Sequence, residues 1–205
     1  MASLRTLTSE LSALGALAIS MPLRFVLPRE RFDPAAPHPT PVVFVHGFLG
    51  DPTNFLVLRS FLSGRGIRNF ASFSYPPRLD YQRLAGRLEQ TIEVVCLAAG
   101  APEVDVVGHS LGGLVARYLV ELGDGRRVRR LVTLGSPYYS DRLPQRELAI
   151  FGSHDPFVPA PLGARDRVVV MGCGHWTLLY HPPVLRTVAC FLGSRTAAAP
   201  AREAA

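Results

Sequence analysis

The feature of this sequence that most constrains its fold is a regular alternation, from residue 41 onward, of short β-branched runs with amphipathic segments. The runs include PVVFVHG, VDVVG and RVVVMG, and most of them are separated by stretches with apolar residues three or four positions apart. Strands that alternate with helices form mostly parallel sheets covered on both faces. The alternation predicts one α/β domain, a three-layer α/β/α sandwich with a mostly parallel sheet of about six strands.

Length and composition agree with a single domain. The chain has 205 residues, of which 48% are hydrophobic and 19% are charged, which is typical of a globular protein with one core. We expect residues 41–193 to form the domain, residues 1–40 to form an N-terminal extension with an apolar helix, and residues 194–205 to be a disordered tail.

The charge of the chain gives little indication of a partner. The net charge of +6 comes wholly from arginine, and the densest arginine cluster, residues 126–130, is expected to be a solvated loop before a strand. No nucleic-acid motif is present, so we expect no nucleic-acid partner. The 3 cysteines do not make a disulfide framework, and no cysteine–histidine spacing predicts a metal site.

The apolar segment near the N-terminus has several interpretations. Residues 11–21 are too few to span a bilayer, which takes about 20 residues. A secretory signal is one interpretation, and a packed or membrane-surface helix that ends at Pro22 is another. The packed or membrane-surface helix favours a cytoplasmic or membrane-associated protein, whereas a secretory signal would mean export, and the sequence leaves both open. A membrane-surface helix also allows peripheral membrane contact through residues 11–27.

A serine stands between a predicted strand and a predicted helix, in the sequence VDVVGHSLGGLVARY. A strand that turns into a helix at one residue strains that residue's backbone, and the positions around it must be nearly bare. Gly108 and Gly112 meet this requirement on either side of Ser110. The hydroxyl then projects above the sheet at the start of a helix, where Ser110 is displayed for nucleophilic attack.

A serine needs a histidine to take its proton and a carboxylate to orient that histidine. In chains that use this turn, the acid and the histidine follow in that order, each after a later strand. His175 follows the last predicted strand, in GCGHWTLL, and is the expected base. Asp155 lies in the turn after ELAIFG and is the expected acid, whereas Asp105 begins the strand that leads to the serine.

Backbone amides are expected to stabilise the oxyanion that attack by the serine creates. The amide of Leu111 lies at the start of the predicted helix. In VFVHGFLG, a strand runs into His46 and Gly47, and the amide of Phe48 then follows with freedom to point at the site. We predict that Phe48 and Leu111 form the oxyanion hole.

With these residues in place, the chain resembles the lipase and esterase branch of the α/β-hydrolase superfamily, and most of all the small bacterial lipases that lack a lid. The matching pieces are VVFVHGFLG, VDVVGHSLGGLVARY, LVTLGSP and GCGHWTLLY. The resemblance implies a serine carboxylic ester hydrolase that acts through an acyl-enzyme, without metal or organic cofactor. Transfer to another acceptor, thioester hydrolysis and an inactive lipid-binding module remain alternatives. We expect a monomer with a small-molecule or lipid ester as its substrate.

Apolar residues beside these positions are expected to line an acyl groove. The predicted substrate-binding residues are Phe48, Leu49, Tyr138, Phe157, Val158 and Trp176. The N-terminal extension has no counterpart in the minimal lipases. Its helix is predicted to lie across or beside the mouth of the site, or to dock to a membrane. The alternative is a helix packed on the far side of the sheet.

Overall fold

The computed structural model of the chain contains one sheet with strand order β2-β1-β3-β4-β5-β6. All neighbouring strands pair in parallel, which confirms the predicted fold class. The structure describes residues 4–22, 30, 32–77, 80–137, 146–160 and 167–194. The strands are β1 (Val42–Val45), β2 (Phe70–Phe73), β3 (Val104–His109), β4 (Val128–Leu134), β5 (Glu147–Gly152) and β6 (Arg167–Val170).

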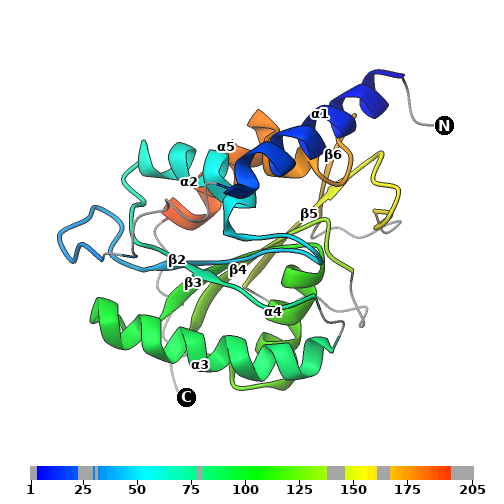
Figure 1. Cartoon of the computed structure of the whole chain (residues 1–205). Helices are drawn as coiled ribbons and strands as arrows, with labels where there is room; N and C mark the ends of the chain where they lie inside the picture. The colour runs from blue at the N-terminus through cyan, green and yellow to red at the C-terminus, as the bar shows by residue number, and fades with distance from the viewer. Residues whose placement is uncertain are drawn as a thin grey trace, which may run out of the picture.

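Helices cover both faces of the sheet, as Figure 1 shows: α3 and α4 lie on one face, and α2 and α5 lie on the other, with α1 beside them. The helices are α1 (Leu4–Ser20), α2 (Leu56–Ser63), α3 (Tyr81–Ala99), α4 (Leu111–Leu122) and α5 (Pro182–Gly193). Short 3₁₀ helices are η2 (Pro52–Phe55), η3 (Gly125–Arg127) and η4 (Thr177–Leu179).

Burial on both faces explains the β-branched runs. Alternate residues of β1 enter different cores, Val42 and Phe44 beneath α2 and α5, and Val43 and Val45 beneath α3 and α4. These four side chains are at most 1% exposed. Burying a valine or phenylalanine side chain stabilises a fold by about 1.5–3 kcal/mol, so a central strand of this kind favours apolar residues at every position.

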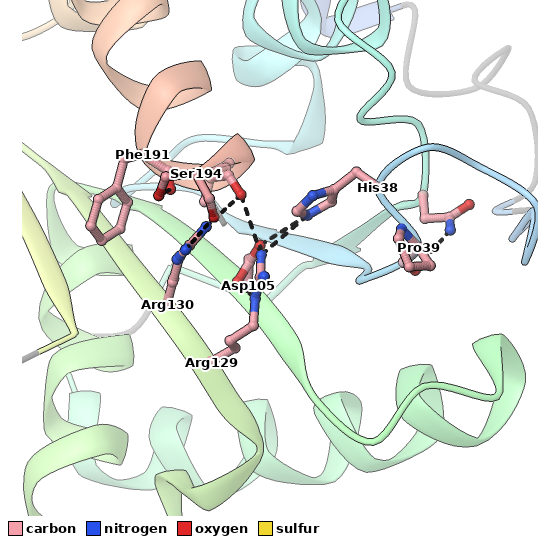
Figure 2. Close-up of polar contacts among 9 residues, drawn as sticks. His38, Pro39, Asp105, Arg129, Arg130, Phe191 and Ser194 are labelled. Atoms are coloured by element: carbon pink, nitrogen blue, oxygen red, sulfur yellow. Dashed lines mark hydrogen bonds and ion pairs between the residues drawn. The ribbon is translucent and has the colours of Figure 1, made fainter. Parts of the chain in front are cut away.

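The arginine cluster is a correction to the sequence analysis, because part of it lies in β4 and not in a solvated loop. Arg129 donates from Nε and Nη2 to the two oxygens of Asp105, at 2.8 and 2.5 Å. Arg130 donates to the carbonyls of Leu192 and Ser194 at the end of α5, at 2.6 and 2.5 Å (Figure 2). A guanidinium can satisfy a buried carboxylate or the free carbonyls of a helix end, and this lets arginine enter the strand.

Candidate active site

The three residues predicted for catalysis follow three strands of the same parallel sheet. Ser110 follows β3 directly, Asp155 lies in the turn after β5, and His175 lies between β6 and η4. The carboxyl ends of parallel strands meet at one edge of the sheet. This edge therefore brings together residues that are up to 65 positions apart in the sequence.

Ser110 has the strained backbone that the sequence predicts. Its φ is 53° and its ψ is −124°, a backbone conformation that residues other than glycine rarely adopt. The glycines around it leave room for this turn: a Cβ atom added to Gly112 would overlap the backbone of β1, and one added to Gly108 would overlap Gly113. The turn therefore holds Ser110 at the N-cap of α4, directly before the first helical residue.

Asp155 and His175 form a buried pair. Nδ1 of His175 donates to Oδ2 of Asp155 at 2.7 Å, and the two residues are only 5% and 8% exposed. The other oxygen of Asp155 accepts from the amides of Phe157 and Val158, at 2.8 and 2.9 Å. Because Nδ1 carries the proton, the lone pair of the neutral imidazole is on Nε2, as a general base requires.

Two further histidines, His46 and His109, support the backbone of the site. His109 donates from Nε2 to the carbonyl of His175 at 3.1 Å, and burial together with the nearby His175 ring lowers its pKa to about 3. His46 donates to the carbonyl of Gly47 at 2.8 Å and stacks on Tyr75, and burial lowers its pKa. Both imidazoles are therefore held neutral at pH 7.

The turn after β1 lies against the serine. A Cβ atom added to Gly47 would lie 3.1 Å from Cβ of Ser110, a closer approach than most Cβ contacts, so glycine favours this packing. The amide of Gly50 closes the turn on the carbonyl of Gly47 at 3.1 Å, and Leu49 has a φ of 59°. Phe48 lies inside this turn, and Leu111 begins α4 with 8% of its surface exposed. Their role in an oxyanion hole stays a prediction.

Ser110 and His175 open on a mostly apolar pocket of about 480 Å³. Four of the residues predicted for substrate binding line it: Phe48, Leu49, Phe157 and Trp176. The rings of Phe157 and Trp176 also pack on the imidazole of His175, with centroids 5.2 and 5.5 Å away. The pocket therefore combines a nucleophile, a paired histidine and an apolar wall.

Val158 does not join this lining. Val158 is 8% exposed and packs with Ala149 and Phe151 in a separate small core, and its amide supports Asp155. The reason is that the Asp155 turn folds this residue inward. Tyr138 lies outside the described residues.

The main lining residues not predicted from the sequence come from α1 and the residue directly after it: Leu14, Leu17 and Ala18 in the helix, then Met21. The helix contacts η2 and η4, on the side of the sheet that α2 and α5 cover (Figure 1). The sequence shows an apolar segment that must be buried against another surface. Hydropathy alone does not identify which of its residues line a pocket. Peripheral membrane contact through residues 11–27 stays a prediction, and residues 23–27 lie outside the described part.

The described part of the chain offers neither a cluster of metal ligands nor a helix that could span a membrane. No group of three or more histidine, cysteine, aspartate or glutamate side chains within that part of the chain has the geometry to hold a metal ion. None of the helices described is both long enough and apolar enough to cross a membrane.

Comparison with known proteins agrees with this architecture. A predicted CIB-like hydrolase from Thermoplasma acidophilum aligns at a TM-score of 0.59 and 19% identity, over 76% of this chain and 87% of that chain. An α/β hydrolase from a Mar Chica lagoon sediment metagenome aligns at 0.55 and 18%, over 73% and 88%. A membrane phospholipase A, described as a bacterial virulence factor, aligns at 0.53 and 13%, over 75% and 78%. At these identities the likeness shows the shared fold.

The sequence model of the palmitoyl protein thioesterase family matches residues 41–145, which is about half of the chain. The matched region includes the turn of Phe48 and the whole Ser110 turn. It ends before Asp155 and His175, which the geometry brings to the same edge of the sheet. The chain therefore belongs to the palmitoyl protein thioesterase family, within the α/β-hydrolase superfamily, and is a hydrolase.

Proposed function

We propose that this protein is a serine hydrolase that cleaves carboxylic esters of apolar acyl chains through an acyl-enzyme intermediate. The observation that carries the proposal is the hydrogen-bonded pair of His175 and Asp155, at 2.7 Å, beside a strained Ser110 in one apolar pocket. A serine, a histidine and a buried carboxylate in this order form the machinery for acyl transfer.

Each residue has one role in the first half of the reaction. The hydroxyl oxygen of Ser110 attacks the carbonyl carbon while Nε2 of His175 takes its proton. Asp155 holds the proton on Nδ1 and stabilises the imidazolium that forms. The amides of Phe48 and Leu111 donate to the oxyanion. The tetrahedral intermediate then collapses, His175 gives its proton to the leaving group, and the acyl group stays on Ser110.

Water completes the cycle by the same route. His175 removes a proton from water, the resulting hydroxide attacks the acyl carbon, and the carboxylic acid leaves as Ser110 regains its proton. The walls formed by Phe48, Leu49 and Phe157, with the α1 side chains, suit an alkyl chain because its burial removes apolar surface from water.

A thioester is the second candidate substrate, and the family match favours it specifically. The acyl-enzyme half of the reaction is identical for an ester and a thioester, since only the leaving group differs. A thiolate is the better leaving group, so the same residues serve both. The two substrates must therefore be compared directly.

The test uses p-nitrophenyl esters of increasing chain length together with an S-acyl cysteine peptide, on the full chain and on Ser110→Ala. We expect turnover of both classes by the wild-type protein, a kcat/KM that rises with acyl length, and loss of turnover in the variant. Binding of lipid without turnover would contradict the proposal and would favour a lipid-binding module. Faster turnover of the S-acyl peptide than of the matched oxygen ester would identify a thioesterase.

A further inference from the structure

Glu10 is a buried carboxylate on the N-terminal helix α1 that the reaction described above does not use. It is 8% exposed, although its neighbour Leu11 is 61% exposed. Within the described residues, Glu10 makes no ion pair that could offset its burial. An acid that is desolvated in this way needs strong hydrogen-bond donors.

The donors come from the loop that carries the catalytic histidine. Oε2 of Glu10 accepts from the amide of Trp176 at 3.0 Å, and Oε1 accepts from the amide of Thr177 at 2.9 Å. These are the two residues directly after His175, more than 160 positions away from Glu10 in the sequence. Both oxygens thus hold the main chain next to the base.

The loop needs such support because it runs from β6 to η4 without a strand of its own. The amides of Trp176 and Thr177 lie at the start of η4, where the first amides of a helical turn have no acceptors within the turn. The fit is close, since a Cβ atom added to Gly174 would lie 2.8 Å from Cγ of Glu10. Glycine at 174 is what admits the carboxylate.

The same helix forms a wall of the pocket. Leu14, one turn after Glu10, and Leu17 line the pocket, and Leu17 also packs on the core beneath α2 and α5. Figure 1 shows α1 running alongside the segment that leads into α5. The helix α1 therefore contacts both the acyl pocket and the backbone directly after His175.

We propose that Glu10 is a positioning residue for His175, acting through the backbone of Trp176 and Thr177. The proposal rests on the function proposed above. Glu10 fixes the position of the loop that follows β6. The loop in turn fixes the position of the His175 imidazole, which donates to Asp155. Reacting groups that are misplaced by about 1 Å can lose about 10²-fold in rate, so this anchor acts on kcat.

The experiment uses the full-length protein with Glu10→Gln, Glu10→Ala and the matched control Ser12→Ala. Ser12 is exposed on the same helix, and it is absent from the pocket lining given above. Glutamine keeps one acceptor oxygen and alanine keeps none. We expect kcat to fall several-fold in Glu10→Gln, about 10- to 100-fold in Glu10→Ala and not at all in Ser12→Ala.

The decisive comparison is between an acetate ester and a long-chain ester. If Glu10 positions His175, kcat falls equally for both esters. If Glu10 only fixes the pocket wall, KM rises for the long-chain ester and kcat for acetate is unchanged, which overturns the proposal. Amide hydrogen exchange supplies a second measurement: in Glu10→Gln, the exchange of Trp176 and Thr177 should accelerate while the strands stay protected, and unchanged exchange of these two amides contradicts the anchor.

Failure of the two proposals can be told apart. If the wild-type protein shows no turnover that depends on Ser110, the proposed function fails before Glu10 is considered. If Ser110 is essential and Glu10→Ala turns over acetate at the wild-type kcat, only the role of Glu10 fails.

Discussion

Within the described residues, two histidine–aspartate pairs lie at opposite edges of the one sheet. His175 and Asp155 are joined at 2.7 Å at the carboxyl edge of the sheet. His38 and Asp105 are joined at 3.2 Å at the amino edge, where β3 begins (Figure 2). Both aspartates are buried, and both imidazoles lie close to a carboxylate oxygen. The pair alone therefore does not identify a catalytic base.

The surroundings of the two pairs differ in ways that decide what each can do. Arg129 donates twice to Asp105, and its Nη2 lies 3.3 Å from Nε2 of His38, the same nitrogen that faces the carboxylate. The guanidinium of Arg129 balances the charge of Asp105. The three side chains form a network that joins β3, β4 and the segment before β1. The carboxylate of Asp155 instead accepts two amides and one imidazole, and an apolar pocket lies beyond. A general base must face its reactant, and of these two histidines His175 lines the pocket and His38 does not.

The largest expected effect separates the two histidines. His175→Ala should lower kcat by roughly 10⁴- to 10⁶-fold, because serine and histidine act as a unit in such sites. His38→Ala should leave kcat unchanged, since His38 contacts the amino edge. Steady-state turnover of a p-nitrophenyl ester measures both variants. Comparable losses of kcat in the two variants would remove the distinction between the pairs.

The two aspartates should separate activity from stability. Asp155→Asn should lower kcat by about 10⁴-fold, because an amide oxygen no longer stabilises the imidazolium. Asp105→Asn should leave kcat of the folded protein unchanged and lower the free energy of unfolding by about 3 kcal/mol, since it removes the carboxylate that balances the charge of Arg129. Urea denaturation and turnover on the same samples test both statements. Loss of kcat in a folded Asp105→Asn protein would contradict them.

Acid should act on the carboxyl edge through His109. Burial first, and the nearby His175 second, lower its pKa from 6.5 to about 3. The unfolded chain therefore takes up a proton below about pH 6.5, whereas the folded protein excludes it until about pH 3. The free energy of unfolding should fall by about 2 kcal/mol between pH 6.5 and pH 5 from this residue. In His109→Gln, the free energy of unfolding, measured by urea denaturation at each pH, should depend less steeply on pH. An identical slope in the variant and the wild type would rule out this role of His109.

The sequence predicted the fold well because the central strands β1, β3 and β4 are buried on both faces. The run VVFV predicts a central strand, and the predicted helix after the serine begins at Leu111, as it does in the structure. The pairing of Asp155 with His175 was also predicted, since each follows a strand of one parallel sheet. Local pattern and chain order were sufficient for these features.

What the sequence did not predict depends on contacts between distant polar residues. Glu10 reaches a loop more than 160 positions away, and no period or motif records that contact. The arginines of β4 were expected in solvent, because their partners Asp105 and the end of α5 are known only once the strands are aligned. Arg117 likewise forms a fully buried ion pair with Glu147 that joins α4 to β5. Burial of a charge is decided by its partner, and a partner is a property of the fold.

The most direct test of the central claim is covalent labelling of the full chain with a fluorophosphonate, followed by peptide mass spectrometry. We expect one adduct, on the hydroxyl of Ser110, because Nε2 of His175 activates that oxygen. Labelling should be absent in Ser110→Ala, greatly slowed in His175→Ala and unchanged in His38→Ala. An adduct on another residue, or labelling of His175→Ala at the wild-type rate, would contradict the account.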